Sequence, residues 1–183
     1  TGVAFALGDS GDTFTVPAGA TIVNSGTATG FGGGKVLQVV QTVETGTSTL
    51  SSSSFVDLGI SVDITPASSS NKVLVIASLD VGGDGGGRGA IRLLRDTTDI
   101  LLADADGSRT RASVAATNAS NAYTVHPNIT YLDSPSSTSA LTYKIQGSIE
   151  GGNSMYLNRS LTNTDSADFY RGTSTLTVME ISG

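Results

Sequence analysis

The stretch TGFGGGKVLQVVQTV, residues Thr29 to Val43, separates two unlike parts of this sequence. Four of the five residues from Gly30 to Gly34 are glycines, which leave the backbone too free for a stiff element. The nine residues that follow are rich in valine, which favours β-strands. We therefore predict a joint between an extended or β-rich stem over residues 1–34 and a β-rich head domain over residues 35–183.

The strand predicted over residues 35–43 is apolar on both faces. Leu37, Val39 and Val43 alternate with Val36 and Val40, so neither face is polar. A strand of this kind is covered on both sides. We expect one face to enter the core of the head. Part of the other face should meet a neighbouring subunit or a covering segment, and Val36 and Val40 are the interface candidates.

Upstream of the joint, FTVPAGAT (residues 14–21) aligns with IVNSGTAT (residues 22–29) as a weak repeat of two units. Two such units bury no apolar face of their own. Phe14, Val16, Ile22 and Val23 would find partners in copies of the same segment from other chains, as in a fibre stem. The alternative is a disordered, glycine-rich tail.

Strand-like runs continue through the rest of the chain. Residues 55–65 alternate apolar and polar side chains, and residues 72–81 form the strongest core strand, which we place centrally because both of its faces are apolar. The further expected strands span residues 90–95, 100–103, 112–116, 123–132, 141–150, 155–157 and 173–181. About nine or ten short strands without a convincing helix predict an antiparallel β-sandwich, and a jelly roll fits the count.

Composition argues against several classes of protein. The chain has 183 residues, enough for one domain with a core. Its net charge of −6 opposes nucleic-acid binding, and the lack of cysteine rules out disulfides and thiolate metal sites. No run of about 18 apolar residues is present to insert into a membrane. Because the sequence starts at Thr1 without a leader pattern, we expect part of a longer polypeptide or a processed product.

Two short motifs suggest enzymes but lack the context that their chemistry needs. The GDSG string of residues 8–11 is shared with serine hydrolases, whose serine needs a histidine base. The single histidine, His126, lies in a strand-like run beside Pro127. The glycine pattern of residues 85–90 matches a relaxed dinucleotide fingerprint, but a β-like run follows it where a helix is required. We predict no enzyme, no catalytic residue and no cofactor.

Asp104 and Asp106 resemble the start of a calcium loop, which needs several closely spaced oxygen ligands. No acidic residue closes such a loop at the proper distance, and Arg109 and Arg111 follow directly. We therefore predict exposed ion pairs and no metal site. A structural ion between loops or on a trimer axis stays open.

Two clusters outside the predicted core strands combine aromatic rings with amide, carboxylate or guanidinium groups. Carbohydrate sites use this combination, because the ring packs on the sugar while polar groups bond its hydroxyls. The receptor-contact candidates in these clusters are Asn153, Tyr156, Asn158, Arg159, Tyr170 and Arg171. The alternative is that the aromatic rings cap the ends of the sandwich.

Seven pieces of the chain carry a resemblance to a known family. They are KVLQVVQT at Lys35, FVDLGISVDITPASSSNKVLV at Phe55, AIRLLRDTTDI at Ala90, GSRTRA at Gly107, YLDSPSSTSALTYKIQ at Tyr131, YLNRS at Tyr156 and the final STLTVMEI. In this order they resemble a C-terminal domain on structural proteins of tailed bacteriophages, especially those that infect aquatic bacteria. The resemblance covers residues 35–183. It implies a virion fibre or spike, usually homotrimeric, with a β-sandwich head and no catalytic residues.

Three functions follow from the sequence as hypotheses. The first is a trimeric phage fibre whose head contacts the host surface through loops at its tip. The second is a capsid decoration or head-fibre protein on the virion shell, and the third and least favoured is an enzyme acting on polysaccharide. The expected partners are further copies of the chain, other virion proteins and a host glycan or protein. We expect no nucleic acid and no membrane insertion.

Overall fold

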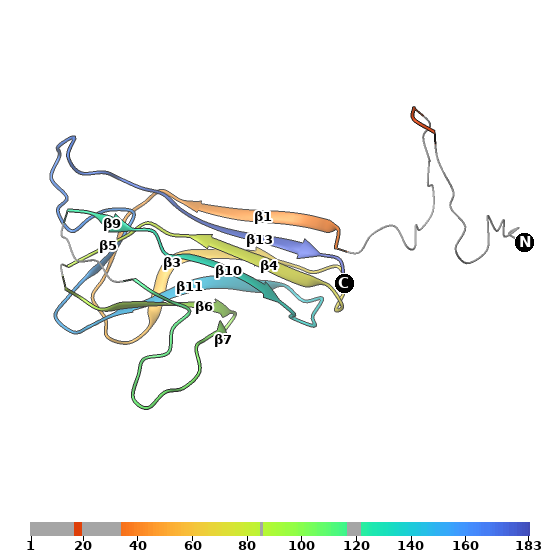
Figure 1. Cartoon of the computed structure of the whole chain (residues 1–183), viewed down its shortest axis with the longest axis horizontal. Helices are drawn as coiled ribbons and strands as arrows, with labels where there is room; N and C mark the ends of the chain where they lie inside the picture. The colour runs from red at the N-terminus through yellow and green to blue at the C-terminus, as the bar shows by residue number, and fades with distance from the viewer. Residues whose placement is uncertain (1–16, 20–33, 85, 117–121) are drawn as a thin grey trace, which may run out of the picture. The chain divides into compact units, whose positions relative to one another are not determined.

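The structure is a computed structural model, and it describes residues 17–19, 34–84, 86–116 and 122–183 (Figure 1). The chain divides into two units, Thr1–Gly32 and Gly33–Gly183. Every strand of the described residues belongs to the second unit, which we call the head. The predicted stem contacts Phe14, Val16, Ile22 and Val23 lie outside the described residues.

The described residues of the head form thirteen strands and no helix, which confirms the all-β prediction. In chain order these are β1 (Val36–Glu44), β2 (Ser48–Leu50), β3 (Val56–Ile64), β4 (Lys72–Ser78), β5 (Val81–Gly83), β6 (Gly89–Arg95), β7 (Thr98–Leu101), β8 (Val114–Ala115), β9 (Thr124–Val125), β10 (Asn128–Asp133), β11 (Leu141–Ile149), β12 (Met155–Leu157) and β13 (Ser174–Ile181). Where the chain is described, no helix is long and apolar enough to cross a membrane.

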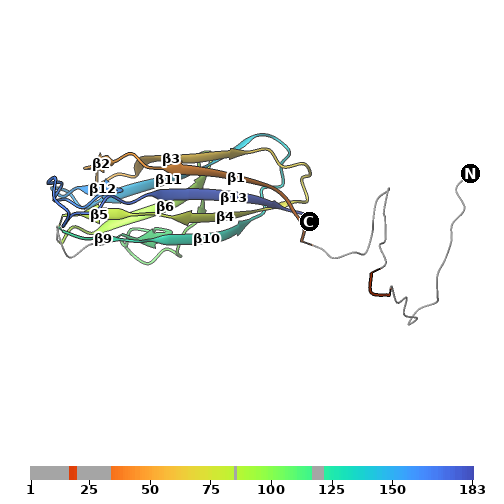
Figure 2. The ribbon, with the colours of Figure 1, turned by 90° about the horizontal axis from the view of Figure 1, so that it is seen from above.

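The strands make three antiparallel sheets. The first has the order β1-β13-β4-β10, and the second has the order β3-β11-β6-β7, with β8 also paired to β6. The third and smallest, β2-β12-β5-β9, lies at one end of the other two (Figure 2). The two large sheets pack as a sandwich, as the strand spacing predicts. A jelly-roll connectivity stays a prediction.

Two predicted strands are broken where the chain passes into the third sheet. The run 72–81 divides into β4 and β5, and the run 123–132 divides into β9 and β10. The two breaks lie side by side, because the Leu79 amide donates to the Pro127 carbonyl at 3.1 Å. Proline has no amide hydrogen to donate to a ladder, so the interruption at Pro127 follows from its chemistry.

The core lies between the two large sheets. Alternate residues of β3, namely Leu58, Ile60, Val62 and Ile64, are buried and face the buried Val75 and Val178 of the first sheet within one cluster. Strand β4 has a neighbour on each side and fully buried valines, which confirms its predicted central place. This burial of apolar surface is the main stabilising contribution to the head.

The head has two distinct ends. At the first, which we call the root end, the Ser182 amide donates to the Lys35 carbonyl at 2.9 Å, and the Gly183 amide donates to Asn71 Oδ1 at 3.2 Å. From there β1 runs to Glu44 at the opposite end, which we call the tip end. The third sheet and the long connection 158–173 lie at the tip end, and the C-terminus lies at the root end (Figures 1 and 2).

The outer face of the first sheet carries an apolar row that crosses all four strands. The register aligns Val39, Met179, Leu74 and Leu132 as one row across all four strands. Val39 and Leu132 are 56% and 46% exposed, and Met179 and Leu74 are half-buried. We call this surface, together with Leu37, Val43 and Ile76, the apolar face. The other residues in the rows of Ile76 and Val43 are polar: Gln41, Thr177 and Thr130 beside Ile76, and Thr175, Ser78 and Asn128 beside Val43.

This arrangement corrects the predicted orientation of β1. Val40 packs against the core, whereas Leu37, Val39 and Val43 are exposed. Val40 is therefore not available to a neighbouring subunit, and Val36 is exposed at the start of the strand, next to a β-bulge. The interface candidates on β1 become Leu37, Val39 and Val43.

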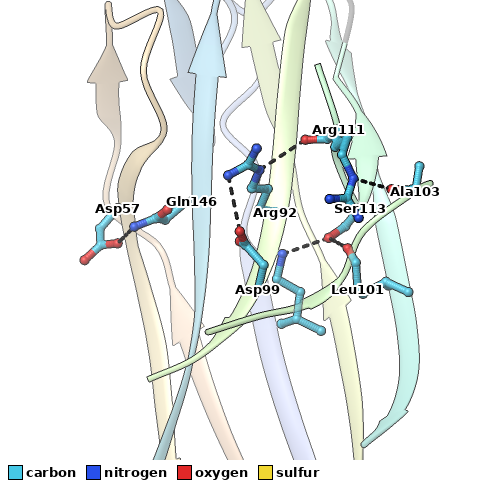
Figure 3. A network of polar contacts seen from close by, with 9 residues as sticks. Asp57, Arg92, Asp99, Leu101, Ala103, Arg111, Ser113 and Gln146 are labelled. Carbon is cyan, nitrogen blue, oxygen red and sulfur yellow. Dashed lines mark hydrogen bonds and ion pairs between the residues drawn. The ribbon is translucent and has the colours of Figure 1, made fainter. Parts of the chain in front are cut away.

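The outer face of the second sheet is polar. Arg92 lies 3.3 Å from Asp99 and 3.1 Å from the carbonyl of Arg111, and Gln146 donates to Asp57 at 2.7 Å (Figure 3). The hydrogen bond from Gln146, opposed by partial burial and supported by Lys144, lowers the pKa of the Asp57 carboxyl below its usual value. The outer face of the first sheet thus carries an apolar row, whereas that of the second sheet carries charged groups.

Candidate functional site

The tip end carries the predicted contact residues, and Asn158 is the most deeply buried of them. Its side chain is 0% exposed and its φ is +59°, a left-handed conformation that asparagine tolerates. Its Nδ2 donates to the carbonyls of Glu44 and Gly46 at 2.8 Å, and its Oδ1 accepts from the Ser174 hydroxyl at 2.7 Å. The prediction that Asn158 contacts a receptor is wrong, because this side chain joins three segments inside the head.

Tyr156 and Arg159 form a closed pair. Tyr156 is only 7% exposed, and the Arg159 guanidinium lies over its ring with the carbon 4.0 Å from the centroid. Arg159 also donates to the Ser160 carbonyl at 3.0 Å and to the Thr49 hydroxyl at 3.0 Å. This cation–π contact covers the ring face that a ligand would use. The pair therefore holds the start of the connection 158–173 against β2 and β12, and it does not match the predicted contact role.

Asn153 lies in the turn between β11 and β12, apart in sequence from the loop 158–173. It is half-buried, and its Nδ2 donates to the Glu150 carbonyl at 3.4 Å. A Cβ built on Gly87 would lie 3.0 Å from the Asn153 Cβ, so the side chain packs closely on the glycine loop. Its role is to close this turn.

Tyr170 and Arg171 are the predicted candidates that the structure leaves accessible. Tyr170 is 77% exposed, and Arg171 is exposed and donates to Asn163 Oδ1 at 3.3 Å. Both line a hollow of about 260 Å³ formed by residues 162–166 and 169–171. Hydroxyl, amide, carboxylate and guanidinium groups line it, so it offers both donors and acceptors of hydrogen bonds.

A second hollow, of about 220 Å³, shares Tyr170 with the first. Its lining also includes Tyr123, which is 68% exposed, together with His126 and Ser160. Tyr123 precedes β9, whereas the alternation over residues 123–132 predicts that it shares a strand face with Val125, Ile129 and Tyr131. Pro127, which is predicted to interrupt this run or to lie at a sheet edge, separates β9 from β10.

His126 lies beside a buried carboxylate. Its Nδ1 is 3.3 Å from Asp80 Oδ1, close enough for an ion pair when the imidazole is protonated. Asp80 is buried, and its amide donates to the Ser174 hydroxyl at 3.0 Å. The serine of the GDSG string, Ser10, lies outside the described residues.

The other motifs have ordinary structural roles. The glycine-rich residues around 82–89 connect β5 to β6, as the sequence predicts. Arg109 forms an ion pair with Asp106 at 3.2 Å, also as predicted. Within residues 17–19, 34–84, 86–116 and 122–183, no three histidine or acidic side chains are grouped so as to hold a metal ion.

A larger hollow, of about 570 Å³, lies beside the second sheet and is lined by Arg88, Glu150 and small residues such as Ala90 and Ala115. Arg88 donates to Glu150 through Nε at 3.0 Å, so the two charged side chains satisfy each other. This mutual pairing raises the pKa of Arg88 and lowers that of Glu150. None of the six predicted receptor-contact residues lines this hollow.

No family model matches the chain, and no curated protein matches it significantly. The resemblance to phage structural proteins thus stays a prediction from the seven sequence pieces. The accessible candidate site is the pair of hollows that meet at Tyr170.

Proposed function

We propose that this protein is a structural virion protein of a tailed bacteriophage, a trimeric fibre whose β-sandwich head contacts the host surface. The observation that carries the proposal is that the chain enters the head at one end and exposes its long connection at the other. Lys35, where the chain enters the head, lies beside Ser182 at the root end, and the exposed Tyr170 lies in the long connection at the tip end. A module attached at one end presents the loops of its other end to a target.

The apolar face supports self-association. Monomeric soluble proteins seldom expose a continuous apolar surface, and such surfaces usually mark protein interfaces. Here Leu37 and Val39 follow the joint at residue 34 closely, and Val39 shares its row with Met179 and Leu74. Three chains brought together by a shared stem would meet through these faces around a common axis. The occupant of the apolar face is therefore another copy of this chain.

The proposal is tested on the full chain by native mass spectrometry. We expect a complex of three chains of 18.5 kDa each. A monomer at micromolar concentration contradicts the trimer. A virion that carries the chain is then imaged by electron microscopy with an antibody against the head. Label on the tail supports the fibre, whereas label on the shell supports the decoration protein instead.

Host contact has its own test. Soluble full chain should compete with that phage for adsorption to its host, because both would occupy the same receptor. Adsorption that remains unchanged at saturating protein contradicts the contact role and leaves the virion location standing.

A further inference from the structure

The two hollows at the tip end form one shallow surface, which we call the tyrosine surface: Tyr123, His126, Ser160, Tyr170, Arg171 and residues 162–166. We propose that the tyrosine surface binds a glycan, with the rings of Tyr123 and Tyr170 packed on sugar rings. This inference rests on the proposed host-contact function and names the class of receptor.

The aromatic rings provide the first argument. Two of the five tyrosines, Tyr143 and Tyr156, are buried, yet Tyr123 and Tyr170 are 68% and 77% exposed. Both border the same hollow, although they lie on segments that are distant in sequence. The C–H face of a pyranose ring is apolar and packs well on an aromatic ring. An extended oligosaccharide that lies in the hollow can contact both rings.

The polar groups provide the second argument. A sugar hydroxyl both donates and accepts hydrogen bonds, so its site needs acceptors beside donors. The hollow next to Tyr170 supplies the Asp165 carboxylate, the Arg171 guanidinium and the Asn163 amide. Charged groups make the stronger of such bonds, and Arg171 is already oriented by Asn163 at 3.3 Å.

Hydrogen bonds within the connection 158–173 also fix its conformation before any ligand binds. The Ser160 hydroxyl donates to the Thr162 carbonyl at 2.7 Å, and the Ser166 hydroxyl donates to Asp168 at 3.1 Å. The Phe169 amide donates to the Ser166 carbonyl at 3.2 Å. These bonds reduce the conformational entropy that binding would otherwise cost.

Other ligand classes fit the surface less well. A peptide is usually anchored by aliphatic or aromatic side chains in apolar pockets, but the lining here consists mostly of short polar side chains. Single-stranded nucleic acid also stacks on aromatic rings, but it needs a positively charged groove. Arg171 shares its loop with Asp165 and Asp168, in a chain of net charge −6. The balance of groups favours a glycan.

The test uses fluorescently labelled full chain on a panel of aquatic bacteria, with binding measured by flow cytometry. Cells that bind are treated with periodate, which cleaves sugars with vicinal hydroxyls, or with proteinase K, which removes surface proteins. We expect periodate to abolish binding and protease to leave it. Polysaccharide purified from those cells should then bind in a calorimetric titration.

Variants connect the binding to the tyrosine surface. Tyr170→Ala and Tyr123→Ala should each weaken polysaccharide binding about tenfold or more, whereas Tyr170→Phe, which keeps the ring, should change it less than about threefold. Val56→Ala, an exposed apolar position in the second sheet and outside both the apolar face and the tyrosine surface, is the matched control and should bind as wild type. Circular dichroism verifies that every variant is folded.

Three other outcomes would each contradict one part of the proposal. Binding that protease removes and periodate spares overturns the glycan but leaves the host-contact function intact, because the receptor is then a protein. Glycan binding that neither alanine variant weakens overturns the assignment to this surface. Binding to no isolate, together with unchanged phage adsorption, overturns the contact function and the inference with it.

Discussion

Val39 of β1 lies directly opposite Met179 of β13, and both side chains point away from the core on the outer face of the first sheet. The next strands continue the row with Leu74 and Leu132. Side chains directly opposite in an antiparallel pair share one face, so the register alone joins these four residues into a continuous apolar row. This row is the structural basis for the proposed trimer.

Val39→Glu should convert the trimer to folded monomers. A carboxylate buried in an interface without a partner is strongly unfavourable, whereas in a monomer this position is 56% exposed and tolerates a charge. Native mass spectrometry gives the oligomeric state, and circular dichroism verifies the fold. Val56→Glu is the matched control, because Val56 is an exposed valine in the second sheet and should leave the trimer intact. A trimer that survives Val39→Glu argues against this interface.

Tyr143→Phe should lower the free energy of unfolding by about 1–2 kcal/mol. The fully buried Tyr143 hydroxyl of β11 donates to Asp133 Oδ2 of β10 at 2.7 Å, and Arg95 of β6 contacts the same oxygen at 2.6 Å. Burial and the bond to Asp133 raise the pKa of Tyr143 well above its usual value. The contact joins the two large sheets. Urea denaturation at pH 7 measures the change, and an unaltered midpoint would show that the contact contributes nothing net.

Glu180 should make the stability of the head depend on acid pH. The carboxylate is 1% exposed and accepts hydrogen bonds from the side chain of Gln38 at 2.7 Å, the amide of Ala67 at 2.7 Å and the side chain of Asn71. Burial by itself would raise the pKa of Glu180, but these hydrogen bonds outweigh it and hold the pKa below the ordinary 4.5.

The sign of that effect follows from linkage. Since the folded pKa of Glu180 is below the unfolded one, its stabilisation is complete above the unfolded value and is lost as pH falls through the folded value. Glu180→Gln should therefore be less stable than wild type at pH 7, and the difference should narrow as pH decreases below about 4.5. Urea midpoints at pH 7, pH 5 and pH 3.5 measure it. If the stability difference between wild type and Glu180→Gln is the same at all three pH values, the lowered pKa of Glu180 is contradicted.

Asn158→Ala should destabilise the head by about 3 kcal/mol. The substitution leaves the carbonyls of Glu44 and Gly46 without their donor, and it places alanine at a φ of +59°. Asn163→Ala, at an exposed position in the same connection, is the control and should change stability by less than about 0.5 kcal/mol. The free energy of unfolding in urea measures both. Equal effects at the two positions would argue against a structural role for Asn158.

The alternation of apolar and polar residues predicts most of the head. In β3, Leu58, Ile60, Val62 and Ile64 alternate with smaller or polar residues, and their burial follows this period of two. The apolar run of β4 likewise predicts its central place. These features are local, because the backbone of a strand sends successive side chains to opposite faces wherever that strand lies.

The local sequence pattern was not sufficient to predict which face of β1 enters the core, or which residues form the candidate site. Val36, Leu37, Val39, Val40 and Val43 make both faces of β1 apolar, so only pairing with β13 and packing on β3 decide that Val40 turns inward. A shift of one residue would reverse every side chain. The site also depends on contacts between distant segments.

The sequence by itself determined the all-β antiparallel class and the approximate place of most strands. Only the tertiary structure decided that Asn158 is an internal hydrogen-bonding residue and that Tyr123 and Tyr170 border one hollow. The physical reason is that burial and proximity across many residues come from the closure of the two large sheets and the third sheet at their end. Residue type and spacing along the chain do not predict which distant segments that closure brings into contact.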